Sequence, residues 1–290
     1  MVNYLNISIV LFNSEFTQIY NLVKVLRANS KVNQVYLIDN SPIKSNLFET
    51  LDSYYIFAGK NLGYGAGHNI AIQKTIDEGV KYHLVLNPDI YFESDVLTHL
   101  IDYADRNEDI GLIMPNVEYP DGQPQHLCKL MASPFDLLGR RFIPFKKWII
   151  SRNILYELRF TDYNQIMSVP SLSGCFMLLR TSVLSKIGGF DERFFMYCED
   201  NDLSRRIGQV SKTIFYPHIT VTHDYEKGSY KDPKLLRYHI TSAFKYFNKW
   251  GWFFDKERKR INKETLLQLG YKKDPVAVLK TQTVKQKDLK

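Results

Sequence analysis

The sequence predicts an α/β fold, in which a mostly parallel, Rossmann-like central sheet is flanked by helices. Two observations lead to this prediction. The first hundred of the 290 residues alternate between short apolar runs, typical of buried strands, and longer segments whose apolar residues recur at helical spacing. Polar residues also follow the apolar runs. These positions would be the carboxyl ends of parallel strands, where sheets of this kind bind their ligands.

Four apolar runs are the predicted strands of this part, at residues 7–12, 34–39, 54–59 and 83–87. Segments after the first, third and fourth runs carry apolar residues on one helical face, and we predict helices there, over residues 19–26, 70–76 and 94–104. A glycine-rich loop, NLGYGAGHN, precedes the second of these helices.

A second patterned region follows a less regular stretch over residues 115–165, which is rich in proline and aromatic residues. Within it, CFMLLR (175–180) predicts a strand, and residues 182–187 predict a short helix that two glycines close. Another helix is predicted to begin at Asp200 and to continue through Ile207.

Composition narrows the class of protein. With 44% hydrophobic and 24% charged residues, the chain can bury one large core or two small ones, which excludes a disordered or fibrous protein. No apolar run approaches the roughly 20 residues of a membrane span, so we expect a cytoplasmic protein. A net charge of +7 favours an anionic partner, either nucleic acid, a membrane surface or a nucleotide. The three cysteines are far apart and lack zinc-site spacing, so we expect reduced structural thiols.

Two segments mix cations with aromatic and aliphatic residues, at 139–152 and 237–254. Each is a candidate surface for docking on a membrane, with apolar groups in the acyl boundary and cations near lipid phosphates. Ordinary packing against the core, with the charges solvated, explains both segments equally well. The tail, residues 272–290, has few large apolar groups and is predicted to be flexible.

Asp89 follows an apolar run, in LVLNPDIYF (84–92), where its hydrophobic pattern ends. Asp39, Asn61 and Asn69 also follow predicted strands. Each alone is explained as a turn residue, but the carboxyl ends of parallel strands share one edge of a sheet, so we expect the four to converge. An acid beside a loop that can bind phosphate suits a hard divalent cation that bridges a diphosphate.

The glycine-rich loop argues against two nucleotide-binding classes. Gly63, Gly65 and Gly67 have the spacing GxGxG and follow the third predicted strand. The dinucleotide fingerprint has GxGxxG after the first strand, which disfavours a nicotinamide enzyme. No Gly-Lys-Ser/Thr follows, so the loop is not a P-loop either.

Three acids cluster at the start of the predicted helix at residue 200: Glu199, Asp200 and Asp202. Helix capping and an ion pair of Asp202 with Arg206 explain such acids without catalysis. The residues before them, FFMYC, are apolar, so a carboxylate here is expected to be partly desolvated. A desolvated carboxylate is a candidate general base.

Five motifs follow one another in order between residues 5 and 250: NLGYGAGHNIAI, LVLNPDI, SGCFMLLR, GGFDERFFMYCEDNDL and FYPHITVTHDYEKGS. This series resembles the family 2 inverting glycosyltransferases with the GT-A fold, especially the bacterial rhamnosyltransferases of O-antigen and cell-wall polysaccharide assembly. The resemblance implies a GT-A catalytic domain with a C-terminal helical, basic extension. The expected boundaries are 1–225 for the catalytic domain (nucleotide-sugar half 1–115, acceptor half 116–225), 226–271 for a helical segment packed on it, and 272–290 for the tail.

The resemblance also implies which residues bind the nucleotide-sugar. Asp39 would contact the pyrimidine base, and the nucleoside and ribose would be lined by Asn61, Gly63 and Asn69. Asn87 and Asp89 match the two ends of the family's DxD motif, with Asn87 in place of the first acid. This departure removes one charge and is expected to weaken the metal site.

For the reaction itself, the resemblance implies that Asp89 and His223 hold a divalent cation, Mg²⁺ or Mn²⁺. Arg205 is expected to help neutralise the diphosphate. Asp200, beside Glu199, would be the catalytic base. On the acceptor side, the residues expected are Gly174, Cys175 and Asp202.

The implied function is metal-dependent transfer of L-rhamnose from dTDP-L-rhamnose to a polyprenyl-diphosphate-linked saccharide. Such an enzyme would be peripheral on the cytosolic face of the plasma membrane and would bind no nucleic acid. A UDP-hexose or UDP-galactofuranose donor is an alternative, and so is a non-catalytic scaffold in a polysaccharide assembly complex. A nucleic-acid-binding module would explain the basic charge but leaves the acids at the strand ends without a purpose.

Overall fold

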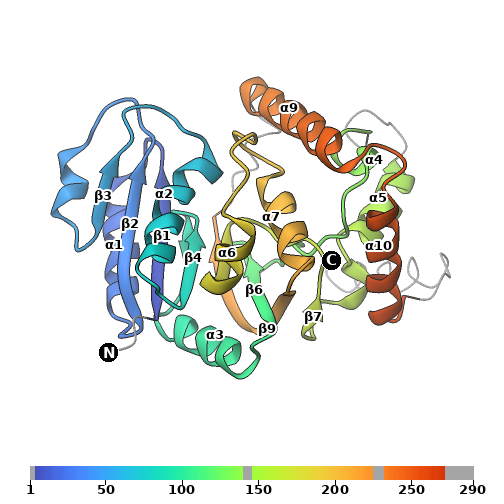
Figure 1. Cartoon of the computed structure of the whole chain (residues 1–290), viewed down its shortest axis with the longest axis horizontal. Helices are drawn as coiled ribbons and strands as arrows, with labels where there is room; N and C mark the ends of the chain where they lie inside the picture. Colours follow the sequence, from blue (N-terminus) through green and yellow to red (C-terminus); the bar gives the residue numbers. More distant parts are fainter. Residues whose placement is uncertain (1–3, 140–145, 225–231, 272–290) are drawn as a thin grey trace.

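A computed structural model describes residues 4–139, 146–224 and 232–271 of the chain. The predicted α/β fold, with a central sheet flanked by helices, is confirmed (Figure 1). The described strands form one sheet in the order β3-β2-β1-β4-β8-β6-β9-β5, with β7 paired to β9. Their bounds are β1 Leu5–Leu11, β2 Val32–Asp39, β3 Tyr54–Phe57, β4 Tyr82–Leu86, β5 Ile90–Tyr91, β6 Ile110–Glu118, β7 Met167–Ser168, β8 Phe176–Arg180 and β9 Lys212–His223.

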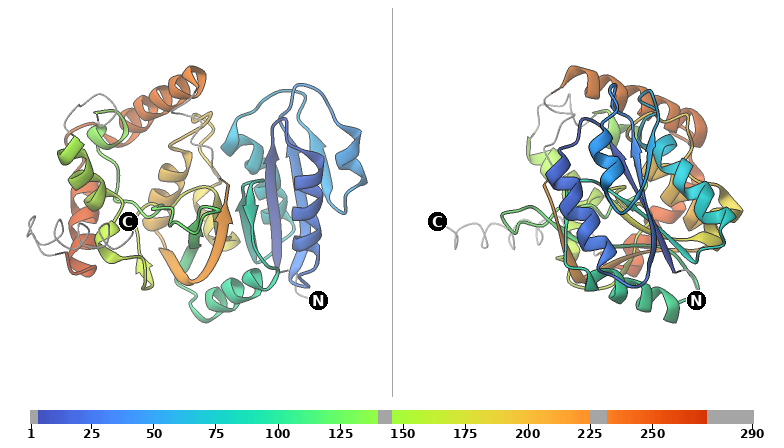
Figure 2. Two further views of the ribbon diagram at one scale, coloured as in Figure 1. Left: turned by 180° about the vertical axis from the view of Figure 1, so that it is seen from behind. Right: turned by 90° about the vertical axis from the view of Figure 1, so that its left-hand side faces the viewer.

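The first four strands pair in parallel, as predicted. Helices cover both of their faces: α1 (Phe16–Arg27) lies on one side and α2 (Tyr64–Asp77) on the other (Figure 2). Residues of β2 alternate between these faces, because Val35 and Leu37 belong to the main core with α1, whereas Tyr36 and Ile38 pack with Ala71 of α2.

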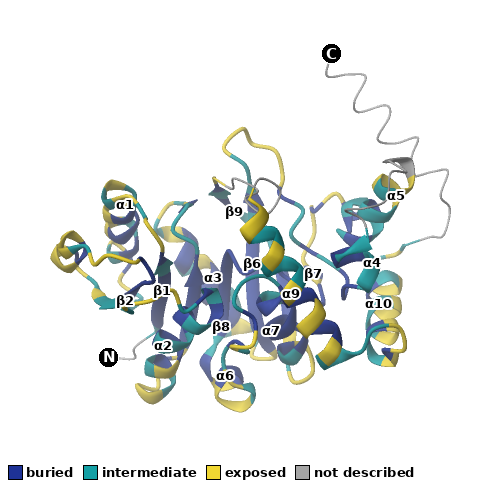
Figure 3. Ribbon diagram, turned by 90° about the horizontal axis from the view of Figure 1, so that it is seen from above, coloured by how far each residue is buried: buried dark blue, intermediate teal, exposed yellow. Residues whose placement is uncertain are grey.

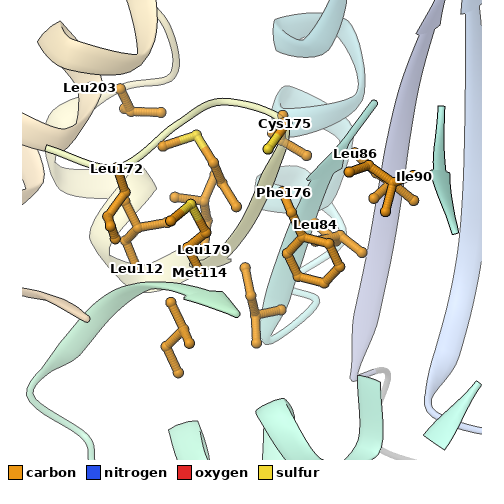
Figure 4. Close-up of a cluster of buried hydrophobic side chains, with 14 of the residues drawn as sticks. Leu84, Leu86, Ile90, Leu112, Met114, Leu172, Cys175, Phe176, Leu179 and Leu203 are labelled. Carbon is orange, nitrogen blue, oxygen red and sulfur yellow. The ribbon is translucent and has the colours of Figure 1, made fainter. Parts of the chain in front are cut away.

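Beyond β4 the sheet is mixed, although its longest pairing there, that of β6 with β9, is again parallel. β8 pairs antiparallel with both β4 and β6, and β9 pairs parallel with β6 but antiparallel with β5 and β7. Apolar side chains from β4, β6, β8 and the adjoining segments form the core at this junction (Figure 4), and buried residues concentrate along the sheet (Figure 3). This core joins the two halves of the sheet.

The remaining helices surround the second half of the sheet. Two of them follow strands, α3 after β5 and α6 after β8, and α7 precedes β9. The last two, α9 and α10, lie at the end of the molecule away from the first strands (Figure 1). Their bounds are α3 Asp95–Arg106, α4 Pro134–Leu137, α5 Lys146–Tyr156, α6 Thr181–Ile187, α7 Glu199–Gly208, α9 Pro233–Trp250 and α10 Lys256–Gln268, with 3₁₀ turns at Asn46–Thr50 and Arg159–Thr161.

Within the described ranges, every helix is too short or too polar to cross a bilayer. Three parts of the sequence predictions lie outside these ranges: residues 140–145 of the first basic segment, residues 225–231 after His223, and the tail 272–290. The three cysteines are free and buried, as predicted.

Candidate active site

Asp89 and His223 lie together because two short strands pair beside them. β4 ends at Leu86, and after a turn β5 begins at Ile90, which pairs with His223 of β9. The backbone N–H of Asp224 donates to the carbonyl oxygen of Asp89 at 3.0 Å. As a result, Oδ1 of Asp89 lies 3.3 Å from Nε2 of His223.

Gln125, which the sequence analysis missed, orients the His223 ring. Its amide nitrogen donates to the His223 carbonyl oxygen at 2.7 Å, so its amide oxygen faces Nδ1 of the ring at 2.9 Å. Nδ1 therefore carries a proton, and Nε2 is left to face Asp89. Burial lowers the pKa of His223, but its contacts with Asp89 and Cys175 outweigh burial and raise the pKa to about 10.

This pair of side chains fits a divalent cation. Oδ1 of Asp89 is shielded from solvent, yet it accepts no well-aligned hydrogen bond from the described residues. Its ion-pair partner in the cation-free protein is Nε2 of His223, and a cation that replaced the Nε2 proton would be held by the same two groups. The described residues contain no cluster of three or more His, Cys, Asp or Glu that could hold a metal ion. Phosphate oxygens and water would therefore supply the other ligands, as is usual for Mg²⁺.

Asp200 and Glu199 open α7, and the Asp200 carboxylate is held by three donors. Its Oδ2 accepts from the backbone N–H of Gly174 at 3.2 Å, while Oδ1 accepts from the backbone N–H and the side-chain amide of Asn201, each at 2.8 Å. These bonds fix the carboxylate at the N-terminus of α7.

The backbone just before these acids is strained. Tyr197 and Cys198 both have φ of 68°, a left-handed conformation that costs a non-glycine residue on the order of 1 kcal/mol or more. Helix α9 packs against this loop: Ser242 donates to the Met196 carbonyl oxygen at 2.7 Å, and the ring of His239 lies 5.5 Å from that of Tyr197. Strain held by surrounding contacts is typical of functional sites.

Tyr64, a second residue that the sequence analysis missed, links the two groups of acids. Its hydroxyl lies 2.9 Å from Oδ1 of Asn87 and 2.7 Å from the carbonyl oxygen of Gly174. The N–H of the same Gly174 donates to Asp200. Tyr64 lies within the glycine-rich motif NLGYGAGHN. Its position between two glycines of that motif is the feature of the sequence that could have identified it as a site residue.

Both groups of acids also affect the ionisation of Tyr64. Burial raises the pKa of the Tyr64 hydroxyl well above its usual value, and the nearby Cys175, Glu199, Asp200 and Asp89 raise it further. Asp89 and Asp200 come from opposite halves of the sheet, yet both act on one phenol. They therefore belong to one site.

Glu199 is almost completely buried, and its Oε2 accepts no hydrogen bond from the described residues. Burial raises the pKa of Glu199 well above the usual value of a glutamate, and the charge of Asp200 raises it further. Two adjacent charged carboxylates are unfavourable in such a place, so the pair favours one neutral acid, Glu199, beside the more exposed Asp200.

Gly63 and Asn61 lie at the N-terminus of α2. Gly63 has φ of 90°, and a Cβ atom there would lie 2.3 Å from the carbonyl oxygen of Phe195. That oxygen accepts the N–H of Tyr64 at 2.9 Å, so only glycine fits this close approach. Asn61 is exposed, and its Oδ1 accepts the N–H of Gly63 at 2.9 Å.

Asp39 ends β2, as predicted, but its side chain is fully buried. Its carboxylate accepts hydrogen bonds from the hydroxyl of Tyr55 at 2.6 Å and from the N–H of Ser41 at 2.9 Å. In this conformation the carboxylate is closed to solvent, so a nucleotide base can contact it only if the residues around it move.

Three residues that we expected at the site point elsewhere. Arg205 is buried and forms bidentate contacts with Asp255 at 2.7 and 3.0 Å, and it also contacts Glu257 of α10 at 2.7 Å. Its guanidinium lies 4.2 Å from the centre of the Trp250 ring. The contacts of Arg205 thus hold α10 against α7.

Asp202 and Asn69 also lie apart from Tyr64 and its acids. Asp202 is fully buried and pairs with Arg206, while Trp250 donates to its second oxygen at 2.8 Å. Asn69 bonds to the backbone N–H and carbonyl oxygen of Phe190, at 2.8 and 2.9 Å. Both residues therefore join α2 or α7 to neighbouring elements. Cys175 lies beside the site: its carbonyl oxygen accepts the N–H of Asn87 at 2.9 Å.

Comparison with known proteins identifies the family. The model of the family described as glycosyl transferase family 2 matches residues 7–188, which is more than half of the chain and contains Tyr64, Asp89 and Gly174. The chain belongs to glycosyl transferase family 2. The membership that the motifs predicted is confirmed.

Two relatives of this family 2 chain are named rhamnosyltransferases, which confirms the predicted similarity. An N-acetylglucosaminyl-diphospho-decaprenol L-rhamnosyltransferase of Mycobacterium tuberculosis is 31% identical over 198 residues, 60% of this chain and 60% of the relative. Rhamnosyltransferase WbbL of Escherichia coli is 27% identical over 239 residues, 79% of this chain and 87% of the relative. The match with the mycobacterial protein thus spans about three fifths of that relative's length.

Solved structures confirm the predicted GT-A fold of the family 2 chain. A crystal structure of GalNAc-T7 with UDP, GalNAc and Mn²⁺ superposes with a TM-score of 0.59 at 15% identity, over 84% of this chain and 48% of that one. The crystal structure of S. aureus TarS gives a TM-score of 0.53 at 15% identity, over 91% and 43% of the two chains. At such identities the likeness concerns the fold alone.

Proposed function

We propose that this chain is an inverting, metal-dependent glycosyltransferase that moves a sugar from a nucleotide-sugar to an acceptor hydroxyl. One observation carries the proposal: the Tyr64 hydroxyl contacts both Asn87, two positions before Asp89, and the carbonyl oxygen of Gly174, whose N–H donates to Asp200. A transferase of this type needs a cation-binding acid near the leaving diphosphate and a proton acceptor near the hydroxyl that attacks. Membership of family 2 supports this assignment.

On the donor side, Asp89 and Nε2 of His223 would hold Mg²⁺ or Mn²⁺, and Gln125 would keep the ring in place. When bound, the cation neutralises the negative charge that develops on the departing diphosphate. The N-terminus of α2, with Gly63 and Asn61, offers N–H groups and an amide to phosphate or ribose oxygens. Asn87 is held by Tyr64 and places its amide group beside His223.

On the acceptor side, Asp200 would take the proton of the hydroxyl as its oxygen attacks the anomeric carbon. The bond from that carbon to the phosphate oxygen breaks in the same displacement, so the configuration inverts and the electron pair leaves with the diphosphate. Gly174 and Asn201 orient the carboxylate through their N–H donors. General bases of this kind contribute about 10²- to 10⁴-fold to the rate.

We assign residues 1–115 mainly to the donor and 116–225 mainly to the acceptor, with His223 and Gln125 as exceptions that serve the donor side. The preferred donor is dTDP-L-rhamnose, and the preferred acceptor is a polyprenyl-diphosphate-linked saccharide at the cytosolic face of the membrane. The name of the mycobacterial relative supports rhamnose and a lipid-diphosphate-linked acceptor, and the name of the E. coli relative supports rhamnose. A UDP-hexose or UDP-galactofuranose is the alternative donor.

A panel of nucleotide-sugars, incubated with the purified chain, membrane extract and Mn²⁺ or Mg²⁺, tests the proposal. We expect release of one nucleoside diphosphate together with a lipid-linked product, both dependent on the cation. Tight binding of dTDP or UDP with no turnover of any donor would instead indicate a non-catalytic scaffold. Turnover that is unchanged by a chelator would contradict the role given to Asp89 and His223.

A further inference from the structure

The turn between α9 and α10 exposes large aromatic side chains to solvent. Phe254 is 91% exposed and Phe253 is 68% exposed. Scattered apolar residues on a surface are ordinary, but two adjacent phenylalanines with so little cover are not. Leu267, near the end of α10, is 67% exposed as well.

The turn that carries these side chains is held firmly by the fold. Arg258 donates to the carbonyl oxygens of Gly251 and Trp252, at 3.4 and 2.8 Å, so its guanidinium clamps the turn from inside. Asp255 caps α10 by accepting the N–H of Arg258 at 2.9 Å, and it forms the buried ion pair with Arg205. The two phenylalanines are therefore presented outward by a fixed backbone.

One face of α10 is basic. Five of its exposed residues recur at spacings of three and four, which places them on one stripe of the helix: Lys256, Lys259, Arg260, Lys263 and Leu267. The two acids of α10 are already paired, Glu257 with Arg205 and Glu264 with Arg260. The three lysines form no ion pair with any described residue.

We propose that this surface, the α10 corner patch, docks on an anionic lipid bilayer; it consists of Phe253, Phe254, Lys256, Lys259, Lys263 and Leu267. Aromatic and aliphatic groups enter the boundary between headgroups and acyl chains, and lysines next to them lie near lipid phosphates. A bilayer accepts a projecting aromatic turn without a preformed pocket, whereas a protein partner needs a complementary one. The uncompensated lysines select an anionic surface.

Helix α9 connects this patch to the candidate active site. Its first half packs on the loop before Glu199, where Tyr238 lies 4.6 Å from Phe195 between ring centres. Its last residue, Trp250, adjoins the exposed turn. Docking would thus hold the site at a fixed orientation to the membrane. In this respect the inference rests on the proposed function, which places the acceptor in the bilayer.

Sedimentation of the full chain with lipid vesicles tests the inference in the absence of donor and acceptor. We expect binding to vesicles that contain phosphatidylglycerol and much weaker binding to pure phosphatidylcholine. The double variant Phe253→Ser/Phe254→Ser should lower the partition coefficient at least tenfold. Lys259→Gln/Lys263→Gln should lower it about fivefold for each lysine at low salt, because a lysine at an anionic surface contributes a factor of this order.

Matched variants at exposed positions elsewhere serve as controls. Ile43→Ser/Leu47→Ser removes two exposed apolar residues, and Lys24→Gln/Lys186→Gln removes two exposed lysines. These doubles should bind vesicles as the unaltered chain does, and all variants should keep its melting temperature. Equal losses in the controls, or no loss in the corner variants, would overturn the proposal.

Two further readouts separate the outcomes. The first is the oligomeric state. If the chain does not bind phosphatidylglycerol vesicles but forms a dimer, and Phe253→Ser/Phe254→Ser abolishes that dimer, the patch is an interface with a second copy of the chain. That result would overturn the inference. Transfer to a water-soluble acceptor reports on the proposed function alone. We expect the corner variants to retain that activity, so failure to bind lipid and failure to transfer sugar are distinguishable.

Discussion

Nε2 of His223 lies 3.3 Å from Oδ1 of Asp89, although 133 positions separate the two residues in the sequence. The short β5–β9 pairing creates this contact, and Gln125 turns the imidazole toward it. The proposed cation site therefore depends on a strand of only two residues, Ile90 and Tyr91.

Asp89→Asn should weaken the binding of dTDP or UDP in the presence of Mn²⁺ at least tenfold, because the amide keeps the shape but loses the charge that holds the cation. Calorimetric titration with and without the cation measures the effect. Asp95→Asn, an exposed acid at the start of α3, is the matched control and should bind as the unaltered chain does. Equal nucleotide affinity with and without Mn²⁺ in the unaltered chain would contradict the prediction.

The affinity for nucleotide with Mn²⁺ should rise with pH up to about 10, the pKa of His223. Below that pH a proton and the cation compete for Nε2, so binding releases a proton and strengthens by as much as about tenfold per pH unit. His223→Gln should flatten this profile.

In the cation-free protein, the same raised pKa predicts an opposite trend for stability. The folded state holds the proton more tightly than the unfolded state, whose histidine has the ordinary value of about 6.5. The contribution of His223 to the free energy of unfolding is thus complete below about pH 6.5 and is lost as the pH rises through about 10. Urea titrations across this range check the sign.

Asp200→Asn should lower kcat by about 10²- to 10⁴-fold and leave the dissociation constant of the nucleotide unchanged, because only proton acceptance is lost. The amide can still accept from Gly174 through its oxygen. Steady-state kinetics and nucleotide titration of the same preparation provide the comparison. Retained turnover would show that Asp200 is not the catalytic base and would leave Glu199 as the candidate for that role.

Tyr64→Phe should lower kcat more than it raises the KM of the donor. Without the hydroxyl, Oδ1 of Asn87 and the carbonyl oxygen of Gly174 lose a shared donor, so the segments that carry the two groups of acids are no longer linked. The lost hydrogen bond should also cost about 1 kcal/mol of unfolding free energy. Tyr20→Phe, on the exposed face of α1, is the control and should change neither value.

Arg205→Met should lower the free energy of unfolding by about 3–5 kcal/mol, because it leaves the buried carboxylate of Asp255 without its cation. Nucleotide affinity of the folded variant should not change. Urea unfolding and calorimetry measure the two quantities. If the variant instead lost nucleotide binding and kept its stability, Arg205 would have the role that the family resemblance implies, which is to neutralise the diphosphate.

Local patterns predicted most of the first half of the fold, but residues 64–69 of the expected glycine-rich loop form the first turns of α2. The strand predicted at residues 34–39 lies within β2, Val32–Asp39, and the helix predicted to close at two glycines is α6, Thr181–Ile187. Such elements depend on hydrophobic periodicity and on turn residues within a few positions. The same signals located Asp89 and Asp200 at the ends of elements that meet at one site.

Contacts between distant residues could not be predicted in this way. Arg205 lies on the helix that carries Asp200, yet its partner is Asp255, 50 positions later, and periodicity contains no information about that choice. Gln125 comes from a stretch without a clear pattern, and only the fold places it against His223. The antiparallel insertion of β8 into the sheet likewise follows from tertiary pairing, which single-sequence patterns do not specify.

The position of β8 has a consequence for how the chain is made on the ribosome. β4 has β1 on one side, but its other neighbour, β8, is synthesised about 90 residues later, on the order of 5 to 20 s at usual translation rates. Until then the nascent protein displays an apolar strand edge that can pair with another chain. The window for aggregation during biosynthesis is therefore set by the length of the segment between β4 and β8.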